Sequence, residues 1–206
     1  MNIAVFVSGN GSNLQALIDE GERGGLAGGR ITLVVSDRPG AFALERARKA
    51  GIRTFVLEPG GHTSREEYDK TVLRRLKEDN IGLVVLAGFM RILSDLFLET
   101  YGGRILNIHP TLLPSFKGAH GIKDAFEYGV KMTGVTVHFV TGELDAGPVA
   151  LQSCVPVDEE DTLKSLEKKI HAVEHKLYPE AVRLFAEGRL KIDGIDGRKV
   201  RIKSNL

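Results

Sequence analysis

Short apolar runs alternate with helical patterns along the first half of the chain. Four apolar runs have the length and composition of buried strands: Ile3–Val7, Ile31–Val35, Thr54–Leu57 and Leu83–Ala87. Three segments between them are rich in helix formers or carry apolar residues at helical spacing: Ser12–Asp19, Ala41–Ala50 and Ser64–Asp79. This alternation predicts a parallel sheet wound by right-handed crossovers.

The second half of the chain has a different pattern. Three further segments are apolar or alternate in polarity, as strands do: Arg104–His109, Gly134–Val140 and Val149–Val157. Loops rich in proline and glycine separate them, with Pro110, Pro114, Gly118 and Gly121. We therefore expect this half of the sheet to be mixed and not strictly parallel.

A long helical pattern and a hairpin pattern complete the chain. The spacing predicts a helix over Thr162–Glu187, with Thr162 as the N-cap and Gly188 as the C-terminal stop. Pro179 lies inside this helix, where we expect it to kink or divide the chain. The segment Leu190–Ile202 has two short alternating runs around a Gly194–Gly197 turn, which predicts a terminal hairpin.

Composition and charge narrow the class of protein. The 206 residues include 28 Lys and Arg and 27 Asp and Glu, for a net charge of +1. This balance argues against binding to nucleic acid or to a membrane surface, because both need a concentrated basic field. The single cysteine, Cys154, excludes an intramolecular disulfide and a cysteine-based zinc cluster, and we expect its side chain in the core. No run of about 18 apolar residues and no signal-peptide pattern is found, so we expect a cytoplasmic protein.

A glycine-rich segment lies where the first strand meets the first helix. It reads Ser8-Gly9-Asn10-Gly11-Ser12-Asn13. Glycines there let the backbone approach a ligand, and the free N–H groups of a helix start favour an anion. The segment is neither a dinucleotide fingerprint nor a P-loop, because Leu14 occupies the third glycine position and no Gly-Lys-Ser/Thr follows. The pattern therefore favours a phosphate site, with a plain tight turn as the alternative.

Two further segments carry polar groups suited to catalysis. Asn107 and His109 lie two residues apart in a predicted strand, so they share one face, and Pro110 ends the strand there. A carboxamide beside an imidazole can stabilise an oxyanion, although a histidine at a strand end can also be structural. The loop Thr141–Pro148 carries Asp145 between glycines. An Asp there can orient and charge a histidine, or it can belong to an ordinary acidic turn.

The segment His171-Ala172-Val173-Glu174-His175 matches the His-x-x-Glu-His pattern of some zinc proteases. Its two histidines share a helical face, so a zinc-dependent hydrolase is a rival interpretation. No downstream helix offers an obvious third ligand, and we expect no metal site there. A non-catalytic nucleotide-binding module built on Gly9–Asn13 is a second rival.

Four segments in this order and spacing resemble one known family. They are Gly9–Gln15, Leu86–Leu93, Asn107–Pro114 and Leu144–Pro148, and together they resemble the glycinamide ribonucleotide formyltransferases. The resemblance runs from about residue 2 to residue 190. It implies a Rossmann-like, mostly parallel twisted α/β sheet with helices on both faces. It also implies a cis peptide bond at Leu113–Pro114.

The resemblance implies an enzyme that transfers the formyl group of 10-formyltetrahydrofolate to the glycyl amine of glycinamide ribonucleotide, in purine biosynthesis. By the same resemblance, the catalytic residues are Asn107, His109 and Asp145. The ribonucleotide-binding positions that it implies are Gly11, Ser12, Asn13, His171 and Glu174. The folate-binding positions that it implies are Arg65, Met90, Arg91, Ile92, Leu93, Asn107, Val140, Thr141, Gly142, Glu143, Leu144 and Asp145.

The resemblance also implies an organisation for the chain. We expect a single domain over residues 1–206, with a phosphate-binding half over 1–100, a folate-binding and catalytic half over 101–190 and the terminal hairpin over 191–206. Related folate-dependent formyltransferases and hydrolases need an added domain that this length does not accommodate. We expect small-molecule partners, no metal, no nucleic acid and no membrane, and either a monomer or a homodimer.

Overall fold

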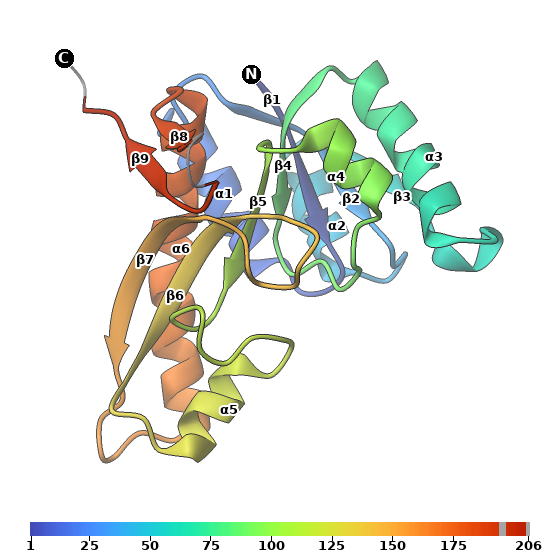
Figure 1. The fold of residues 1–206 in the computed structure, drawn as a ribbon. Coiled ribbons are helices and arrows are strands. Elements are labelled where there is room, and N and C mark those ends of the chain that lie inside the picture. Colours follow the sequence, from blue (N-terminus) through green and yellow to red (C-terminus); the bar gives the residue numbers. More distant parts are fainter. Residues whose placement is uncertain (194–196, 205–206) are drawn as a thin grey trace.

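A seven-stranded sheet forms the centre of the computed structural model, which describes residues 1–193 and 197–204 (Figure 1). Its strands are β1 (Asn2–Val7), β2 (Arg30–Ser36), β3 (Arg53–Val56), β4 (Ile81–Leu86), β5 (Ile105–His109), β6 (Met132–Phe139) and β7 (Val149–Pro156). The helices are α1 (Ser12–Glu22), α2 (Phe42–Lys49), α3 (Arg65–Glu78), α4 (Asp95–Tyr101), α5 (Gly121–Tyr128) and α6 (Leu163–Ala186), with a 3-10 turn at Pro59–Gly61.

The strand order is β3-β2-β1-β4-β5-β6-β7. Strands β1 to β5 pair in parallel, whereas β6 and β7 pair antiparallel. This confirms the prediction of a mostly parallel, Rossmann-like sheet with a mixed second half. The change of direction occurs at β5, which carries Asn107 and His109 and pairs with β4 on one side and β6 on the other.

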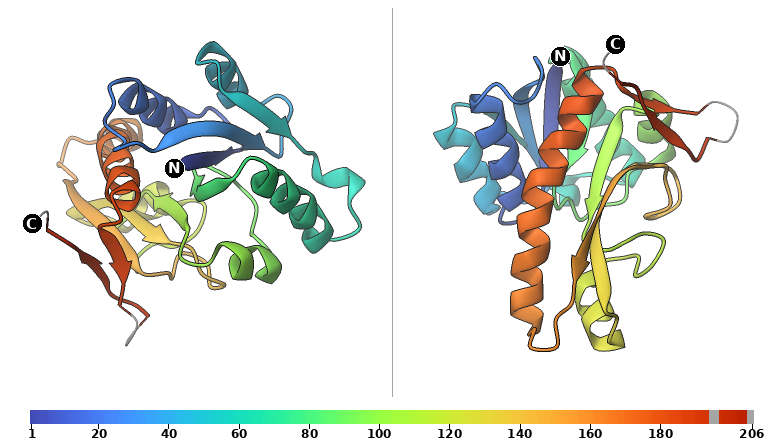
Figure 2. Two further views of the ribbon diagram at one scale, coloured as in Figure 1. Left: turned by 90° about the horizontal axis from the view of Figure 1, so that it is seen from above. Right: turned by 90° about the vertical axis from the view of Figure 1, so that its left-hand side faces the viewer.

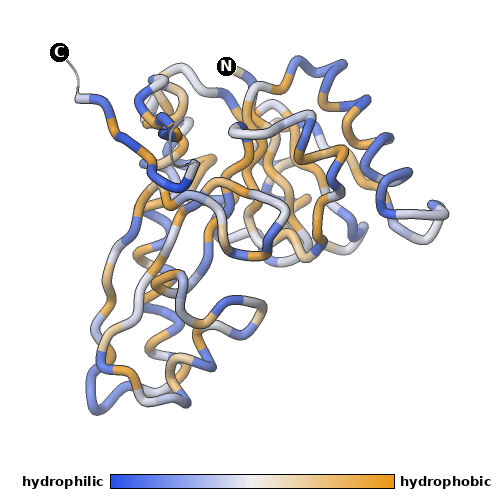
Figure 3. Tube along the Cα trace, in the orientation of Figure 1, coloured by the Kyte–Doolittle hydropathy of each residue, from blue (hydrophilic) through white to orange (hydrophobic). Residues whose placement is uncertain are grey.

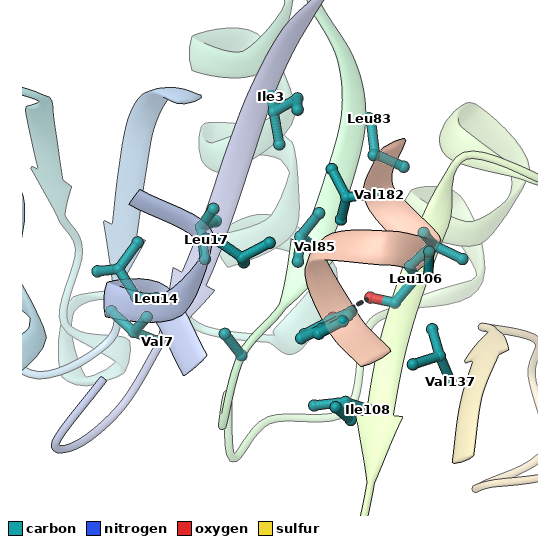
Figure 4. Close-up of a cluster of buried hydrophobic side chains, with 14 of the residues drawn as sticks. Ile3, Val7, Leu14, Leu17, Leu83, Val85, Leu106, Ile108, Val137 and Val182 are labelled. Carbon is teal, nitrogen blue, oxygen red and sulfur yellow. Dashed lines mark hydrogen bonds between the residues drawn. The ribbon is translucent and has the colours of Figure 1, made fainter. Parts of the chain in front are cut away.

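Alternate residues of the parallel strands enter two separate cores. In β1, Ile3, Val5 and Val7 face the core covered by α1, α2 and α6, whereas Ala4 and Phe6 face the core covered by α3 and α4. Figure 4 shows part of the first core, and Figure 3 shows the apolar strands at the centre with polar residues on the outer surface of the helices. Burial on both faces explains why these strands are continuous apolar runs in the sequence.

Helix α6 crosses the sheet as one long element (Figure 2). Thr162 caps it through a hydrogen bond from Ser165 N, and Gly188 follows its end at a φ of 69°, so the predicted cap and stop are confirmed. We expected Pro179 to kink or divide this helix, and it does not divide it. Tertiary packing accounts for this, since neighbouring Tyr178, Ala181 and Val182 are all fully buried.

Three features differ from the sequence-based expectations or extend them. Helices α4 and α5 occupy segments for which the pattern predicted no helix. Both are short, at 7 and 8 residues, so their periodicity is weak. Cys154 is exposed and not in the core, because β7 is an edge strand with alternate residues facing outward. The Leu113–Pro114 peptide bond is cis, as the resemblance implied.

The C-terminal hairpin is confirmed. Strand β8 (Leu190–Ile192) pairs antiparallel with β9 (Val200–Ile202). The predicted turn at Gly194–Gly197 lies largely outside the described residues, which omit 194–196. Within the described ranges, the helices are all too short or too polar to cross a bilayer.

Candidate active site

A cleft of about 770 Å³ opens at the carboxyl ends of β1, β4 and β5. Open α/β sheets bind their ligands at this edge, where the strand order reverses. All but one of the residues that we predicted to bind or catalyse line this cleft. They are Gly11, Ser12, Asn13, Met90, Arg91, Ile92, Leu93, Asn107, His109, Val140, Thr141, Gly142, Glu143, Leu144, Asp145, His171 and Glu174.

Arg65 is the exception. It occupies the first turn of α3, directly after the N-cap Ser64, and it is not among the residues that line the cleft. The sequence alone did not distinguish a ligand-binding arginine from an ordinary charge at the start of a helix.

The glycine-rich loop forms one end of the cleft. Gly11 has a φ of 76°, and a Cβ added to it would lie 2.5 Å from Ala43 Cβ, so only glycine fits this close approach to α2. Arg46 of α2 fixes the loop by donating to the Asn10 carbonyl over 2.9 Å and to Asn10 Oδ1 over 3.1 Å. The loop therefore presents the start of α1, at Ser12, to the cleft, in the geometry that suits a phosphate.

A polar cluster on α6 faces this loop. Asn13 Nδ2 donates to Glu174 Oε2 over 3.2 Å, and His171 Nδ1 lies 2.8 Å from the same oxygen. The hydrogen bond to Glu174 raises the pKa of His171. Burial lowers the pKa of His175, which is not among the lining residues. Of the residues in the zinc-like pattern, His171 and Glu174 thus form a pair that faces the glycine-rich loop.

Asn107, His109 and Asp145 meet elsewhere in the same cleft. Asp145 Oδ2 lies 3.5 Å from His109 Nδ1 and accepts a hydrogen bond from Gly118 N over 2.9 Å. His109 Nε2 lies 2.8 Å from the carbonyl oxygen of Phe116. Since a carbonyl only accepts, this nitrogen carries a proton and donates it. Both ring nitrogens of His109 therefore face hydrogen-bond acceptors.

A second histidine, His138, belongs to the same cluster, and we did not predict it from the sequence. It is 2% exposed, and its Nε2 lies 3.1 Å from Asn107 Nδ2 and 3.7 Å from Asp145 Oδ1. Its Nδ1 donates to the Phe139 carbonyl over 2.9 Å, and burial lowers its pKa. A neutral His138 with its proton on Nδ1 accepts from the Asn107 amide, which fixes the orientation of that amide.

The loop that carries Asp145 is held in a strained conformation. Asp145 has a φ of 49°, in the left-handed region that few residues other than glycine adopt. Two residues later, a Cβ on Gly147 would lie 1.8 Å from the Phe139 carbonyl oxygen. Glycine at 147 therefore lets the loop pack against the end of β6 and places the Asp145 carboxylate between the two histidines.

Two segments with exposed apolar side chains, the Met90–Leu93 wall and the Val140–Asp145 wall, line the same cleft as Asn107, His109 and Asp145. Met90 and Ile92 on one wall are 65% and 61% exposed, and Leu144 on the opposite wall is 57% exposed. All three line the cleft. Exposed apolar side chains concentrated in a cleft are typical of a site for a flat, partly apolar ligand.

A profile of the formyl transferase family matches residues 1–182. The chain belongs to the formyl transferase family. It is 47% identical over 192 residues to the phosphoribosylglycinamide formyltransferase of Escherichia coli (strain K12), covering 93% of this chain and 90% of that protein. It is also 43% identical over 201 residues to the human trifunctional purine biosynthetic protein adenosine-3, covering 98% of this chain but 20% of the human protein.

A solved member of the formyl transferase family has the same fold. The crystal structure of glycinamide ribonucleotide transformylase 1 from Symbiobacterium toebii superposes with a TM-score of 0.94 at 48% identity, covering 99% of this chain and 94% of that one. Membership of this family disfavours the zinc-hydrolase interpretation. Within the described residues, no group of three or more His, Cys, Asp and Glu side chains is arranged to hold a metal ion.

Proposed function

We propose that this chain transfers the formyl group of 10-formyltetrahydrofolate to the glycyl amine of glycinamide ribonucleotide, as part of purine biosynthesis. The observation that carries the proposal is the position of Asn107, His109 and Asp145 between the glycine-rich loop and the two apolar walls of one cleft. That arrangement places a group able to stabilise an oxyanion between a phosphate-binding end and an apolar end. The relatives named phosphoribosylglycinamide formyltransferase support the choice of reaction.

The two ligands divide between the two ends of the cleft. Gly11, Ser12 and Asn13 bind the phosphate at the start of α1, and Glu174 accepts a hydrogen bond from the ribose, with His171 beside it. The pterin of the folate lies between the Met90–Leu93 wall and the Val140–Asp145 wall. In this proposal residues 1–100 form most of the phosphate-binding half, and residues 101–190 supply the catalytic groups and the second folate wall.

The chemistry begins when the amine nitrogen attacks the formyl carbon. A carbon–nitrogen bond forms, and the carbonyl electrons move to the oxygen and give a tetrahedral oxyanion. Asn107 and His109 donate hydrogen bonds to that oxygen. The oxyanion then collapses, the bond to the folate N10 breaks, and the proton lost by the amine is delivered to N10 by water or by His109.

His109 has to release one of its present partners to reach the oxyanion. Its Nε2–H donates to the neutral Phe116 carbonyl, whereas its Nδ1 faces the Asp145 carboxylate. Breaking the contact with the neutral carbonyl costs less than breaking a contact with an ionised carboxylate. We therefore place the Nε2–H on the substrate side, with the loop around Phe116 withdrawing when substrate binds.

A formyl-transfer assay tests the proposal directly. Wild-type protein is given glycinamide ribonucleotide and 10-formyltetrahydrofolate, and the tetrahydrofolate released is measured. We expect Asp145→Asn to lower kcat by about 100–1000-fold, the loss typical of one oxyanion-stabilising group. An inactive, folded wild type contradicts the function, whereas full activity in Asp145→Asn contradicts only the role of Asp145.

A further inference from the structure

The wall formed by Gly88–Ser94 has no regular secondary structure, and its residues 88–93 line the cleft. Within the described residues, the N–H and C=O groups of Arg91, Ile92 and Leu93 make no hydrogen bond. Backbone polar groups at a protein surface without such bonds are solvated or are satisfied by a ligand. The wall is therefore held in place by contacts other than its own backbone ladder.

One contact is a buried relay at Met90. The Met90 N–H donates to Ser8 Oγ over 3.0 Å, and Ser8 Oγ donates to Asp37 Oδ1 over 2.6 Å. Ser8 and Asp37 are both buried, at the carboxyl ends of β1 and β2. Because the hydroxyl has one proton, its donation to Asp37 leaves a lone pair for the Met90 N–H.

A second buried carboxylate acts at the other end of the wall. Asp69 Oδ2, on α3, accepts from Ser94 N over 2.6 Å, and both residues are buried. The adjacent residue on α3, Tyr68, lies under the Arg91 guanidinium, 4.4 Å from the ring centroid. Ser8, held by Asp37, and Asp69 thus accept from backbone N–H groups four residues apart, while the side chains of Met90 and Ile92 remain exposed.

We propose that Asp37, acting through Ser8, and Asp69 are positioning residues that hold the Gly88–Ser94 wall in its folate-binding conformation. This inference rests on the proposed function. Ser8 Oγ, which is held by Asp37, accepts the Met90 N–H, and the Asp69 carboxylate accepts the Ser94 N–H. The free backbone groups of Arg91–Leu93 then face the ligand without having to reorganise, which lowers the entropic cost of binding.

The first test is Ser8→Ala, which removes the acceptor of the Met90 N–H. We expect the KM for 10-formyltetrahydrofolate to rise about 5- to 100-fold, the ratio that corresponds to a buried N–H left without its acceptor. The KM for glycinamide ribonucleotide and kcat should change less than about 3-fold, because the relay does not touch that substrate. Equal rises in both KM values, or an unchanged folate KM, would overturn the proposal.

Ser36→Ala is the matched control. Ser36 is also a buried serine at the end of a strand of this sheet, but its hydroxyl donates to the Arg38 carbonyl and accepts from Arg38 N. We expect its kinetic constants to equal those of the wild type. A folate KM raised equally in Ser36→Ala and Ser8→Ala would show a general packing effect and contradict the relay.

The carboxylates are tested by paired substitutions. Asp37→Ala removes the acceptor of the Ser8 hydroxyl, whereas Asp37→Asn keeps an amide oxygen in its place. We expect Asp37→Ala to raise the folate KM and Asp37→Asn to restore it to within about 2-fold of the wild type. Asp69→Ala should raise the same KM by the same mechanism at Ser94. If Asp37→Asn raises the folate KM as much as Asp37→Ala does, the role of Asp37 as the acceptor of the Ser8 hydroxyl is contradicted.

Amide hydrogen exchange provides a readout that does not depend on activity. In the wild type without ligand, we expect the Met90 and Ser94 amides to exchange more slowly than the amides of Arg91–Leu93. Ser8→Ala should raise the exchange rate of the Met90 amide alone, and Asp69→Ala should raise that of the Ser94 amide. A Met90 amide that exchanges freely in the wild type overturns the proposal. An inactive wild type with protected amides overturns the proposed function instead.

Discussion

The β1 side and the β5–β6 side of the cleft are lined by different kinds of chemical group. On the β1 side, the lining includes the glycine-rich loop, the start of α1 and the Met90–Leu93 wall. On the β5–β6 side, three buried titratable residues, His109, His138 and Asp145, lie within 4 Å of one another or of Asn107. The first side presents the backbone N–H groups of a helix start, with His171 and Glu174 of α6 facing them, whereas the second presents a buried cluster of side chains.

This difference follows from the topology of the sheet. A parallel strand is followed by a helix, so its carboxyl end offers free N–H groups at a helix start. Where the sheet turns antiparallel, the register instead sets side chains directly opposite each other, and Asn107 on β5 faces His138 on β6. The antiparallel pairing of β6 with β5 thus adds the His138 side chain beside Asn107 on this side of the cleft.

Gly147→Ala should have the largest effect on the catalytic end. The added Cβ would lie 1.8 Å from the Phe139 carbonyl oxygen, so the loop has to move and carry Asp145 with it. We expect kcat to fall about 100-fold, as a displacement of about 1 Å in a catalytic group costs. Steady-state kinetics measure the loss, and circular dichroism checks the fold.

Gly40→Ala serves as the control for this substitution. Gly40 lies outside the cleft, has no neighbouring atom within 4 Å of an added Cβ, and has no positive φ. Its kcat should equal that of the wild type. A Gly147→Ala protein with an unchanged kcat would show that the position of Asp145 tolerates movement, and the comparison between the two ends would then fail.

Gly11→Ala tests the binding end with a somewhat smaller effect. Its Cβ would lie 2.5 Å from Ala43 Cβ, and its φ of 76° is strained for alanine. Overpacking typically costs about 1–3 kcal/mol, which corresponds to about 5- to 150-fold in the KM for glycinamide ribonucleotide. We expect kcat at saturating substrate to stay within about 3-fold. A loss confined to kcat would assign the glycine-rich loop to catalysis.

His171 should give the smallest effect, and one that depends on pH. The hydrogen bond to Glu174 raises its pKa, so the imidazolium persists above the ordinary value near 6.5 and attracts the phosphate. The KM for glycinamide ribonucleotide should therefore rise as the pH increases through that raised pKa. The side chain is 49% exposed, so we expect only about a 1.5- to 5-fold change, as for a surface ion pair.

His171→Gln should remove this pH dependence while the protein remains folded and active. The contribution of His171 to the stability of the fold also decreases as the pH rises. Because the folded-state pKa is raised, the interaction with Glu174 stabilises the fold at pH values below about 6.5 and is lost as the pH rises through the folded-state pKa. A pH profile of KM unchanged in His171→Gln would exclude His171 as the titrating group.

The sequence was sufficient to predict the strands, the long helix and the order of the elements. Buried strands and α6 are long or strongly apolar, so their pattern is clear even in a single sequence. Helices α4 and α5 are short, and packing against the sheet stabilises them more than their own periodicity does. Pro179 does not divide α6 for a related reason, since the buried face of the helix outweighs one missing hydrogen bond.

The candidate site was predictable only in part. The spacing of Asn107 and His109 predicted that they share one face of a strand end, whereas their catalytic role was implied only by the resemblance to the family. His138 was missed because it lies within an ordinary alternating strand, and only the pairing of β5 with β6 sets it opposite Asn107. Similarly, nothing in the local sequence connects Ser8 with Asp37 or Met90, because these contacts depend on how three strand ends are arranged.

One contact on α6 bears on which acceptors the cleft can accommodate. The Tyr178 hydroxyl donates to the carbonyls of Leu86 and Leu106, the last residue of β4 and the residue before Asn107, over 2.8 and 3.0 Å. Glu174 lies one turn earlier on the same helix and faces Asn13. Helix α6 thus fixes the separation between Glu174 and the strand end that carries Asn107. On the proposed function, an acceptor whose amine lies one methylene farther from its ribose would bind at Glu174 but hold its amine away from the formyl carbon.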